Sequence, residues 1–199
     1  AVVGITGAAV TVVDEDAIDL GAATVSGTYS VTAGGAVTDS GTQEIAGVTT
    51  ISASGRDVTL NTSTNNFANE VRITGAAVTV VDEDAIVLGA STVSGTYSVT
   101  AGGAITDEGT QEITGVTTLV AGSSNDITLN TATNNFAAAV VITSGRNVAI
   151  TDEDAIDLGA ATVSGTYAIT ATTGGITDSG TQEIAGVTTL EAGSSNDIT

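Results

Sequence analysis

Internal repetition is the feature that most constrains how this chain can fold. The stretch 24–50, TVSGTYSVTAGGAVTDSGTQEIAGVTT, recurs almost unchanged at 92–118 and, one residue longer, at 162–189. The acidic triplets begin at positions 14, 82 and 152, which gives a ~70-residue period. Such a period is typical of a repeat architecture, in which each unit packs on the next. The sequence therefore divides into repeats 1–68, 69–137 and 138–199, the last incomplete.

A finer period lies inside each repeat. The segments TVSGTYSVTAGGAITDEG, EITGVTTLVAGSSNDITLN and NFAAAVVITSGRNVAITDEDAIDLG share one plan. In each, apolar positions alternate, a Gly, Ser or Asn turn follows, and a second short alternating stretch ends the segment. Alternation with period two places these apolar side chains on one face of a strand and the Thr, Ser and Tyr residues between them on the other. The predicted inner residues are Val93, Val99, Ile105, Ile113, Leu119, Ile127, Phe136, Ile142 and Val148.

Similar residues in similar places favour stacked coils over a sandwich of hairpins, whose neighbouring strands need not resemble each other. We therefore predict an all-β fold, a parallel β-helix (β-solenoid) with about three coils per ~70-residue repeat, right-handed by the usual rule for parallel connections. Coils of ~23 residues would number eight to nine and give a rod about 40 Å long. The one stretch with a helical alternative is 14–20, DEDAIDL, where an Asp would cap a short helix.

Composition limits the classes of partner. The chain lacks Pro, Cys, Met, Trp and His and carries a formal charge of −20, which repels nucleic acids and anionic lipid surfaces. Its 41% hydrophobic content excludes intrinsic disorder, and no apolar run reaches the ~20 residues of a membrane-spanning helix. We expect a folded protein without disulfides, nucleic-acid partners or membrane insertion.

The acidic triplets are the sharpest chemical feature, because clustered carboxylates are the ligands that Ca²⁺ prefers. The candidate calcium ligands are Asp14, Asp16, Asp82, Asp84, Asp152 and Asp154. The alternative is a solvated acidic corner that keeps the rod soluble. Two observations weaken the calcium interpretation: Asp19 and Asp157 correspond to Val87 in the second repeat, and the calcium-binding pattern GGxGxD is absent. Calcium is the one candidate cofactor, and the sequence does not require it.

Other activities find less support. Paired carboxylates serve glycosidases, but here they recur in near-identical copies, whereas an active site is a single asymmetric constellation. With no His or Lys, we expect no enzyme.

The Thr residues at 24, 28, 32, 49 and 50 would suit an ice-binding array but are also ordinary strand formers on a wet surface. The row at Tyr29, Tyr97 and Tyr167 would grip glycans if exposed, or pack against a coil.

The two ends lie inside repeats and show no polar cap. A solenoid without caps exposes strand edges that recruit another chain. Two expectations follow: covalent continuation in a longer chain, or end-to-end self-association into a filament by a contact that does not close.

A family resemblance enters with three segments, TVSGTYSVTAGGAITDEGTQEITGVTT, AGSSNDITLNTATNNFAAAVVI and DAIDLGAATVSG. They resemble the repeats of bacterial surface adhesins of the filamentous haemagglutinin type, over essentially the whole chain. The resemblance implies a right-handed β-helical shaft, an extracellular or cell-surface location, and binding of a host or cell-surface glycan or protein by other regions. The expected function is the shaft of an adhesin or the unit of an extracellular filament. The alternative is a Ca²⁺-dependent glycan-binding or carbohydrate-active β-helix.

Overall fold

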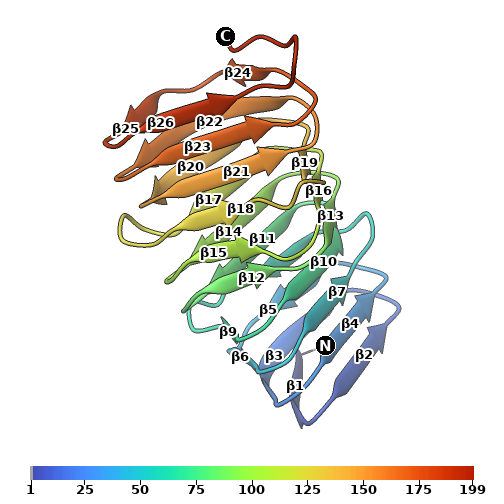
Figure 1. The fold of residues 1–199 in the computed structure, drawn as a ribbon. Helices are drawn as coiled ribbons and strands as arrows, with labels where there is room; N and C mark the ends of the chain where they lie inside the picture. The colour runs from blue at the N-terminus through green and yellow to red at the C-terminus, as the bar shows by residue number, and fades with distance from the viewer. Residues whose placement is uncertain (1) are drawn as a thin grey trace.

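The computed structural model describes residues 2–199, which form a rod of stacked strands running from the N-terminus at one end to the C-terminus at the other (Figure 1). All regular structure in this range is β, in 26 strands shared equally between two 13-stranded sheets. Every strand pairing is parallel, from β1 with β3 (Val2–Gly7 and Ile18–Val25) to β23 with β26 (Tyr167–Ala171 and Thr188–Glu191). The prediction of a parallel β-solenoid is confirmed.

The first sheet contains β1 (Val2–Gly7), β3 (Ile18–Val25), β5 (Val37–Asp39), β6 (Gln43–Ile45), β8 (Val58–Leu60), β9 (Asn66–Phe67), β11 (Val78–Asp82), β14 (Tyr97–Ala101), β17 (Thr117–Val120), β20 (Val140–Gly145), β22 (Ile156–Val163), β24 (Ile176–Asp178) and β25 (Gln182–Ile184). The second sheet contains β2 (Val10–Asp14), β4 (Tyr29–Ala33), β7 (Thr49–Ser52), β10 (Val71–Gly75), β12 (Ile86–Leu88), β13 (Ser91–Val93), β15 (Ile105–Asp107), β16 (Gln111–Ile113), β18 (Ile127–Leu129), β19 (Asn135–Phe136), β21 (Val148–Asp152), β23 (Tyr167–Ala171) and β26 (Thr188–Glu191).

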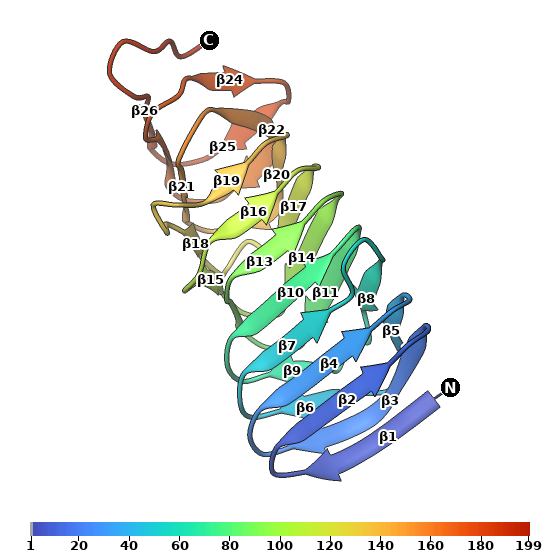
Figure 2. The same cartoon turned by 90° about the vertical axis from the view of Figure 1, so that its right-hand side faces the viewer.

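We use the word rung for the part of one coil that crosses one sheet. A rung is either a single strand or two short strands joined by a bend. Two-strand rungs are β5 with β6, β8 with β9, β12 with β13, β15 with β16, β18 with β19, and β24 with β25. Each sheet then has ten rungs, and the chain crosses the two sheets alternately (Figure 2). The solenoid therefore has about ten turns, more than the eight to nine expected, because several coils are shorter than the sequence suggested. The partner of Val71 in the next rung is Leu88, whereas that of Thr117 is Val140, so the second of these two coils is the longer.

One repeat covers three and a half turns, so the repeats alternate between the sheets. The YSVTA strand of the first repeat, β4, lies in the second sheet, its counterpart β14 lies in the first, and β23 returns to the second. The equivalent strands β3 and β22 are seven rungs apart in the strand order of the first sheet. Each repeat thus turns its outer surface to the opposite side from its neighbours. The sequence suggested about three coils per repeat and did not reveal this half-turn.

Aliphatic side chains fill the space between the two sheets. All nine predicted inner residues are buried, with Val99, Ile105 and Leu119 at 0% exposure and Ile113 the most exposed at 2%.

The tyrosine row also lies inside. An outward position for Tyr29, Tyr97 and Tyr167 is wrong, because all three are buried at 1% exposure and pack against the coils. Thr49 is likewise buried rather than part of an outer Thr array. The reason is parity: Tyr29 alternates in phase with the inner Val31 of β4, and Thr49 in phase with the inner residue two positions on in β7.

The helical alternative for residues 14–20 is wrong. Strand β2 ends at Asp14 and β3 begins at Ile18, so the acidic triplet is the corner between them. In the second repeat, the Gly-Gly turn of the next coil stacks directly on this corner. Gly102 N donates to Asp82 O at 3.0 Å and Gly103 N to Asp84 O at 2.8 Å. A Cβ on Gly102 would overlap the carbonyl oxygen of residue 83, so this position requires glycine because two backbones approach closely.

Candidate functional site

The acidic triplets occupy corresponding corners at the ends of β2, β11 and β21. Asp82, the first residue of its triplet, is buried at 2% exposure. Its Oδ2 accepts a hydrogen bond from Phe67 N at 2.8 Å, and its Oδ1 accepts one from Asp84 N at 2.8 Å. Phe67 lies in β9, which pairs with β6 on one side and with no described strand on the other. The carboxylate therefore takes the place of a strand at the edge where the two-strand rungs end.

The third triplet repeats this arrangement. Asp152 is fully buried, and it accepts hydrogen bonds from Phe136 N at 2.7 Å and from Asp154 N at 2.8 Å. In the first triplet, Asp14 accepts the bond from Asp16 N at 2.9 Å and is only half-buried. The first aspartate of the triplet thus accepts a backbone N–H from the preceding coil in both repeats where the structure describes that coil.

Burial changes the acidity of these two carboxyl groups. Desolvation raises the pKa of Asp82 to about 6, although the hydrogen bonds from Phe67 N and Asp84 N act in the opposite direction. Desolvation likewise raises the pKa of Asp152 to about 6. The corners at Asp82 and Asp152 therefore each contain one carboxyl group that gains a proton more readily than an ordinary aspartate.

The structure brings the first and third residues of each triplet together through the backbone, and leaves Asp16, Asp84 and Asp154 exposed. Among residues 2–199, no three His, Cys, Asp or Glu side chains gather closely enough to hold a metal ion. The calcium site stays a prediction. The carboxylates of Asp82 and Asp152 are buried, and each of their oxygens already accepts one backbone N–H.

A second polar corner was missed by the sequence analysis. Asp39 accepts hydrogen bonds from Asn61 N at 2.8 Å and from Asn65 Nδ2 at 2.6 Å. Asn65 Oδ1 accepts from Gln43 N at 2.9 Å, and Gln43 Nε2 donates to Gly21 O and Gly41 O at 2.8 and 2.7 Å. Gln43 and Asn65 are fully buried. The chain of bonds fixes the bend between the two strands of a rung.

The second repeat builds the same corner from Asp107, Asn134 and Gln111, with Asn134 Nδ2 donating to Asp107 Oδ2 at 2.7 Å and Gln111 N donating to Asn134 Oδ1 at 2.9 Å. The signal was present, because T-D-x-G-T-Q is followed about twenty positions later by N-N-F in both repeats. Asn65 and Asn134 are the buried middle residues of these polar corners and lie in the two N-N-F segments. Their partners come from the neighbouring coil, which local sequence does not reveal.

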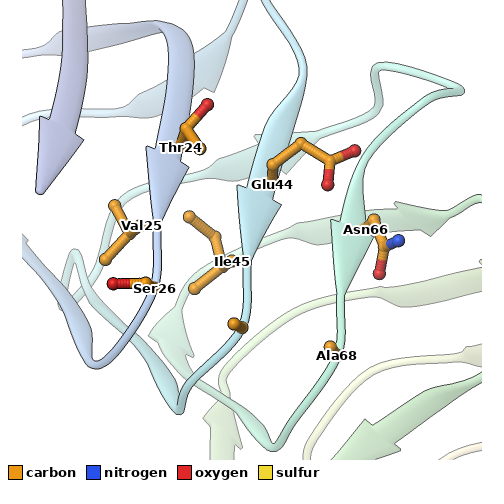
Figure 3. Close-up of a pocket in the computed structure, with 8 residues that line it drawn as sticks. Thr24, Val25, Ser26, Glu44, Ile45, Asn66 and Ala68 are labelled. Atoms are coloured by element: carbon orange, nitrogen blue, oxygen red, sulfur yellow. The ribbon is translucent and has the colours of Figure 1, made fainter. Parts of the chain in front are cut away.

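Beside this bend the surface is hollowed. Figure 3 shows Thr24, Glu44 and Asn66 on three neighbouring strands, in register at one outer row. The hollow measures about 240 Å³ and has Val25 and Ile45 at its base. A second hollow of about 410 Å³ lies two repeats on, at residues 162 and 183. Both belong to the first sheet, since two repeats make seven turns.

The three arginines neutralise little of the surface charge. Arg72 pairs with Glu70, and Arg146 pairs with Asp126 at 2.7 Å, both on the exposed surface. The hydrogen bonds from the Arg146 guanidinium lower the pKa of Asp126 to about 2. Arg56 Nε donates to the backbone of residue 34 at 3.2 Å. The remaining acids leave a surface that repels anions and favours uncharged or cationic partners.

Comparison with known proteins adds one finding to this geometry. The DUF5649 family, described as repeats of unknown function, matches the chain three times, at residues 7–74, 75–143 and 145–199. No curated protein and no solved structure matches it. Residues 2–199 contain no helix long and apolar enough to cross a membrane. Since the three matches cover nearly the whole chain and follow its internal repeats, the protein belongs to the DUF5649 repeat family.

Proposed function

We propose that this chain is a structural shaft segment of an exported bacterial surface protein, a rigid rod that spaces or displays other regions and performs no catalysis. The observation that carries the proposal is the way the repeats stack. Near-identical units continue one another through seven rungs from β3 to β22, with one aliphatic core throughout. A solenoid of this kind grows in length by adding repeats without changing its cross-section.

The surface supports the same function. The outer residues are mostly Thr, Ser and acids, and the net charge of −20 discourages lateral association of rods. The buried carboxylates and amides hold corners together rather than meeting in a cleft. The resemblance to adhesins of the filamentous haemagglutinin type supplies the finer part of the proposal, namely adhesion and a cell-surface location.

The end-to-end contact is part of the same proposal. Strand β26 carries TTLE, the counterpart of TTIS in β7, which pairs with VRIT of β10 from Val71↔Thr49 to Thr74↔Ser52. A following repeat, in the same chain or a second copy, would offer the same partner to β26. This pairing would extend both sheets without a new type of contact.

Surface labelling tests the location. Antibodies raised against this chain should label intact cells that produce the protein, and external proteinase K should remove the label. Labelling that requires lysis of the cells would contradict a surface location.

Imaging and scattering test the shaft. Small-angle scattering of the purified chain should give a rod cross-section, and a compact spherical profile would contradict a shaft. Electron microscopy should separate short rods from fibres, and long fibres would support end-to-end association of separate copies.

A calcium titration tests the alternative function. Thermal unfolding with millimolar Ca²⁺ should show an unchanged midpoint, because the buried carboxylates already hold backbone N–H groups. A rise in the midpoint would favour the calcium-dependent glycan-binding alternative.

A further inference from the structure

The core contains recurring polar side-chain atoms that make no hydrogen bond within the described chain. The same three positions are involved in the first and second repeats, and the atoms are Oη of Tyr29 and Tyr97, Oε1 of Gln43 and Gln111, and Oγ1 of Thr49 and Thr117. All six residues are exposed by 1% or less. An unpaired buried polar atom destabilises the folded state, and native proteins pair nearly all such atoms. Recurrence in both repeats indicates a shared partner rather than an accident of one coil.

In the second repeat, three polar groups lie close together. Ser91 Oγ and Gln111 Nε2 donate to the same carbonyl, Gly89 O, at 3.2 and 2.8 Å, and Ser91 and Gln111 are neighbours in register. The Ser91 hydroxyl also lies near Tyr97. Burial raises the pKa of Tyr97, and the nearby Ser91 hydroxyl partly offsets this rise. The tyrosine therefore reaches across from the first sheet to the Ser91 and Gln111 side of the second.

Thr117 completes the group from the next coil. It is the register partner of Tyr97 in the next rung of the first sheet, and its side chain also points inward. In the first repeat, Thr49 is placed next to Tyr29 in the same way. Ala23 there takes the place of Ser91, so the feature that both repeats share is the set of Tyr, Gln and Thr.

The third repeat carries the same set of side chains near the C-terminal end of the rod, where they border a cavity. Tyr167, Gln182 and Thr188 line a single cavity of about 210 Å³, together with Asp178 and aliphatic side chains such as Ile184. Gln182 Nε2 donates to the carbonyl oxygen of residue 159 at 2.7 Å, as the glutamines of the other repeats do to the corresponding glycines, while its Oε1 is unpaired. The three side chains thus face one space.

The chemistry of the group selects a small neutral ligand. The glutamine oxygen only accepts, whereas the two hydroxyl groups both donate and accept. No cation from Lys or Arg lies among the residues that line the cavity, and the surrounding aliphatic side chains would penalise an ion. A molecule that donates two hydrogen bonds and accepts one satisfies all three groups, and a buried water typically makes about three such bonds.

We propose that the first and second repeats each bind one internal water molecule between Tyr Oη, Gln Oε1 and Thr Oγ1, at Tyr97, Gln111 and Thr117 and again at Tyr29, Gln43 and Thr49. The water donates to the glutamine and threonine oxygens and accepts from the tyrosine hydroxyl. It joins the two sheets at the point where the bend between β15 and β16, or between β5 and β6, replaces straight strand pairing.

Magnetic relaxation dispersion of ¹⁷O water, which counts long-lived internal waters, tests the proposal on the intact chain. Tyr29→Phe and Tyr97→Phe remove one hydroxyl each and keep the ring, so each should lower the count by one and the double variant by two. Ser98→Ala, beside Tyr97 on the outer side of β14, is the matched control and should leave the count unchanged. A count unchanged in a folded Tyr97→Phe variant would overturn the proposal.

A high-resolution crystal structure of the unaltered chain provides a second measurement that does not depend on a variant folding. A water peak within about 2.5–3.0 Å of both Tyr97 Oη and Gln111 Oε1 is the expected result. A direct hydrogen bond from Tyr97 Oη to Gln111 Oε1 would overturn the proposal. The absence of a water peak, with both atoms unpaired, would overturn it as well.

Discussion

At the scale of single residues, the aspartates of one triplet have different tasks although they are neighbours in sequence. Asp82 is buried and holds the N–H of Phe67, while Asp84 is exposed and offers its backbone N–H to Asp82. Removing a buried partner leaves an unpaired donor, whereas removing an exposed carboxylate leaves a solvated corner. The same chemical group therefore has unequal weight in stability.

Replacing Asp82 with alanine should lower the free energy of unfolding by about 2 kcal/mol, because Phe67 N loses its acceptor at the edge of β9. The Asp84→Ala control should change it by less than ~0.5 kcal/mol, as is usual for surface substitutions. Urea unfolding followed by circular dichroism measures both values. Equal effects for the two variants would show that the buried hydrogen bond does not hold the corner.

The raised pKa of Asp82 and Asp152 predicts how stability depends on pH. Their pKa of about 6 in the folded chain exceeds the ~3.9 of an unfolded aspartate, so between these values the folded state binds more protons. The free energy of unfolding should therefore rise as pH falls from 7 through 6 towards 4, and this gain should be lost as pH rises again.

Thermal midpoints at several pH values measure this dependence, and the double variant Asp82→Asn/Asp152→Asn isolates the two groups. Its curve should be flatter between pH 7 and 5 than that of the unaltered chain. The remaining slope reports relief of repulsion among the other acids. Identical slopes in the two proteins would assign the whole dependence to surface charge.

At the scale of elements, corners rather than strands decide how coils fit together. The strands alternate in a simple pattern, but each coil closes through turns that lie directly on turns of the coil below. Gly102 rests on the backbone of Glu83, where no Cβ fits, whereas Gly122 has open space around it and needs glycine for its positive φ of 76°. Two glycines of similar appearance in the sequence are thus required for different reasons.

Gly102→Ala should cost about 3 kcal/mol, because the methyl group must push two stacked backbones apart. Gly122→Ala should cost about 1 kcal/mol, the penalty of a left-handed conformation for a residue with a Cβ. Unfolding free energies of the two variants provide the comparison. The reverse order would show that backbone conformation, not coil spacing, limits this solenoid.

At the scale of the whole molecule, the half-turn left over by each repeat determines what the rod presents. Equivalent surface rows of repeats 1 and 3 lie on the first sheet, and those of repeat 2 lie on the second. A longer array with these repeats would display the same row on alternating sides, which balances the two faces of a shaft.

Spin labels can measure this arrangement, since the chain has no Cys of its own. Labels at cysteines replacing the exposed residues Thr24 and Thr162 should lie about 34 Å apart along one side, from seven rungs at ~4.8 Å. The pair at Thr24 and Thr92 should give about 20 Å, since these residues lie three and a half turns, or about 17 Å, apart along the rod and on opposite sheets about 10 Å apart. A Thr24–Thr92 distance of only about 14 Å, the height of three rungs at ~4.8 Å, would indicate three whole turns per repeat.

The sequence alone determined the stacked parallel strands, the repeat period and the nine inner residues, because alternation and recurrence are local signals that every coil repeats. Tertiary structure decided the half-turn, the burial of Asp82 and the joining of Asp39 to Asn65. These depend on which residues of successive coils meet, and coils of unequal length shift that alignment at every corner. An acidic triplet looks like a solvated turn until the coil beneath it presents the N–H of Phe67.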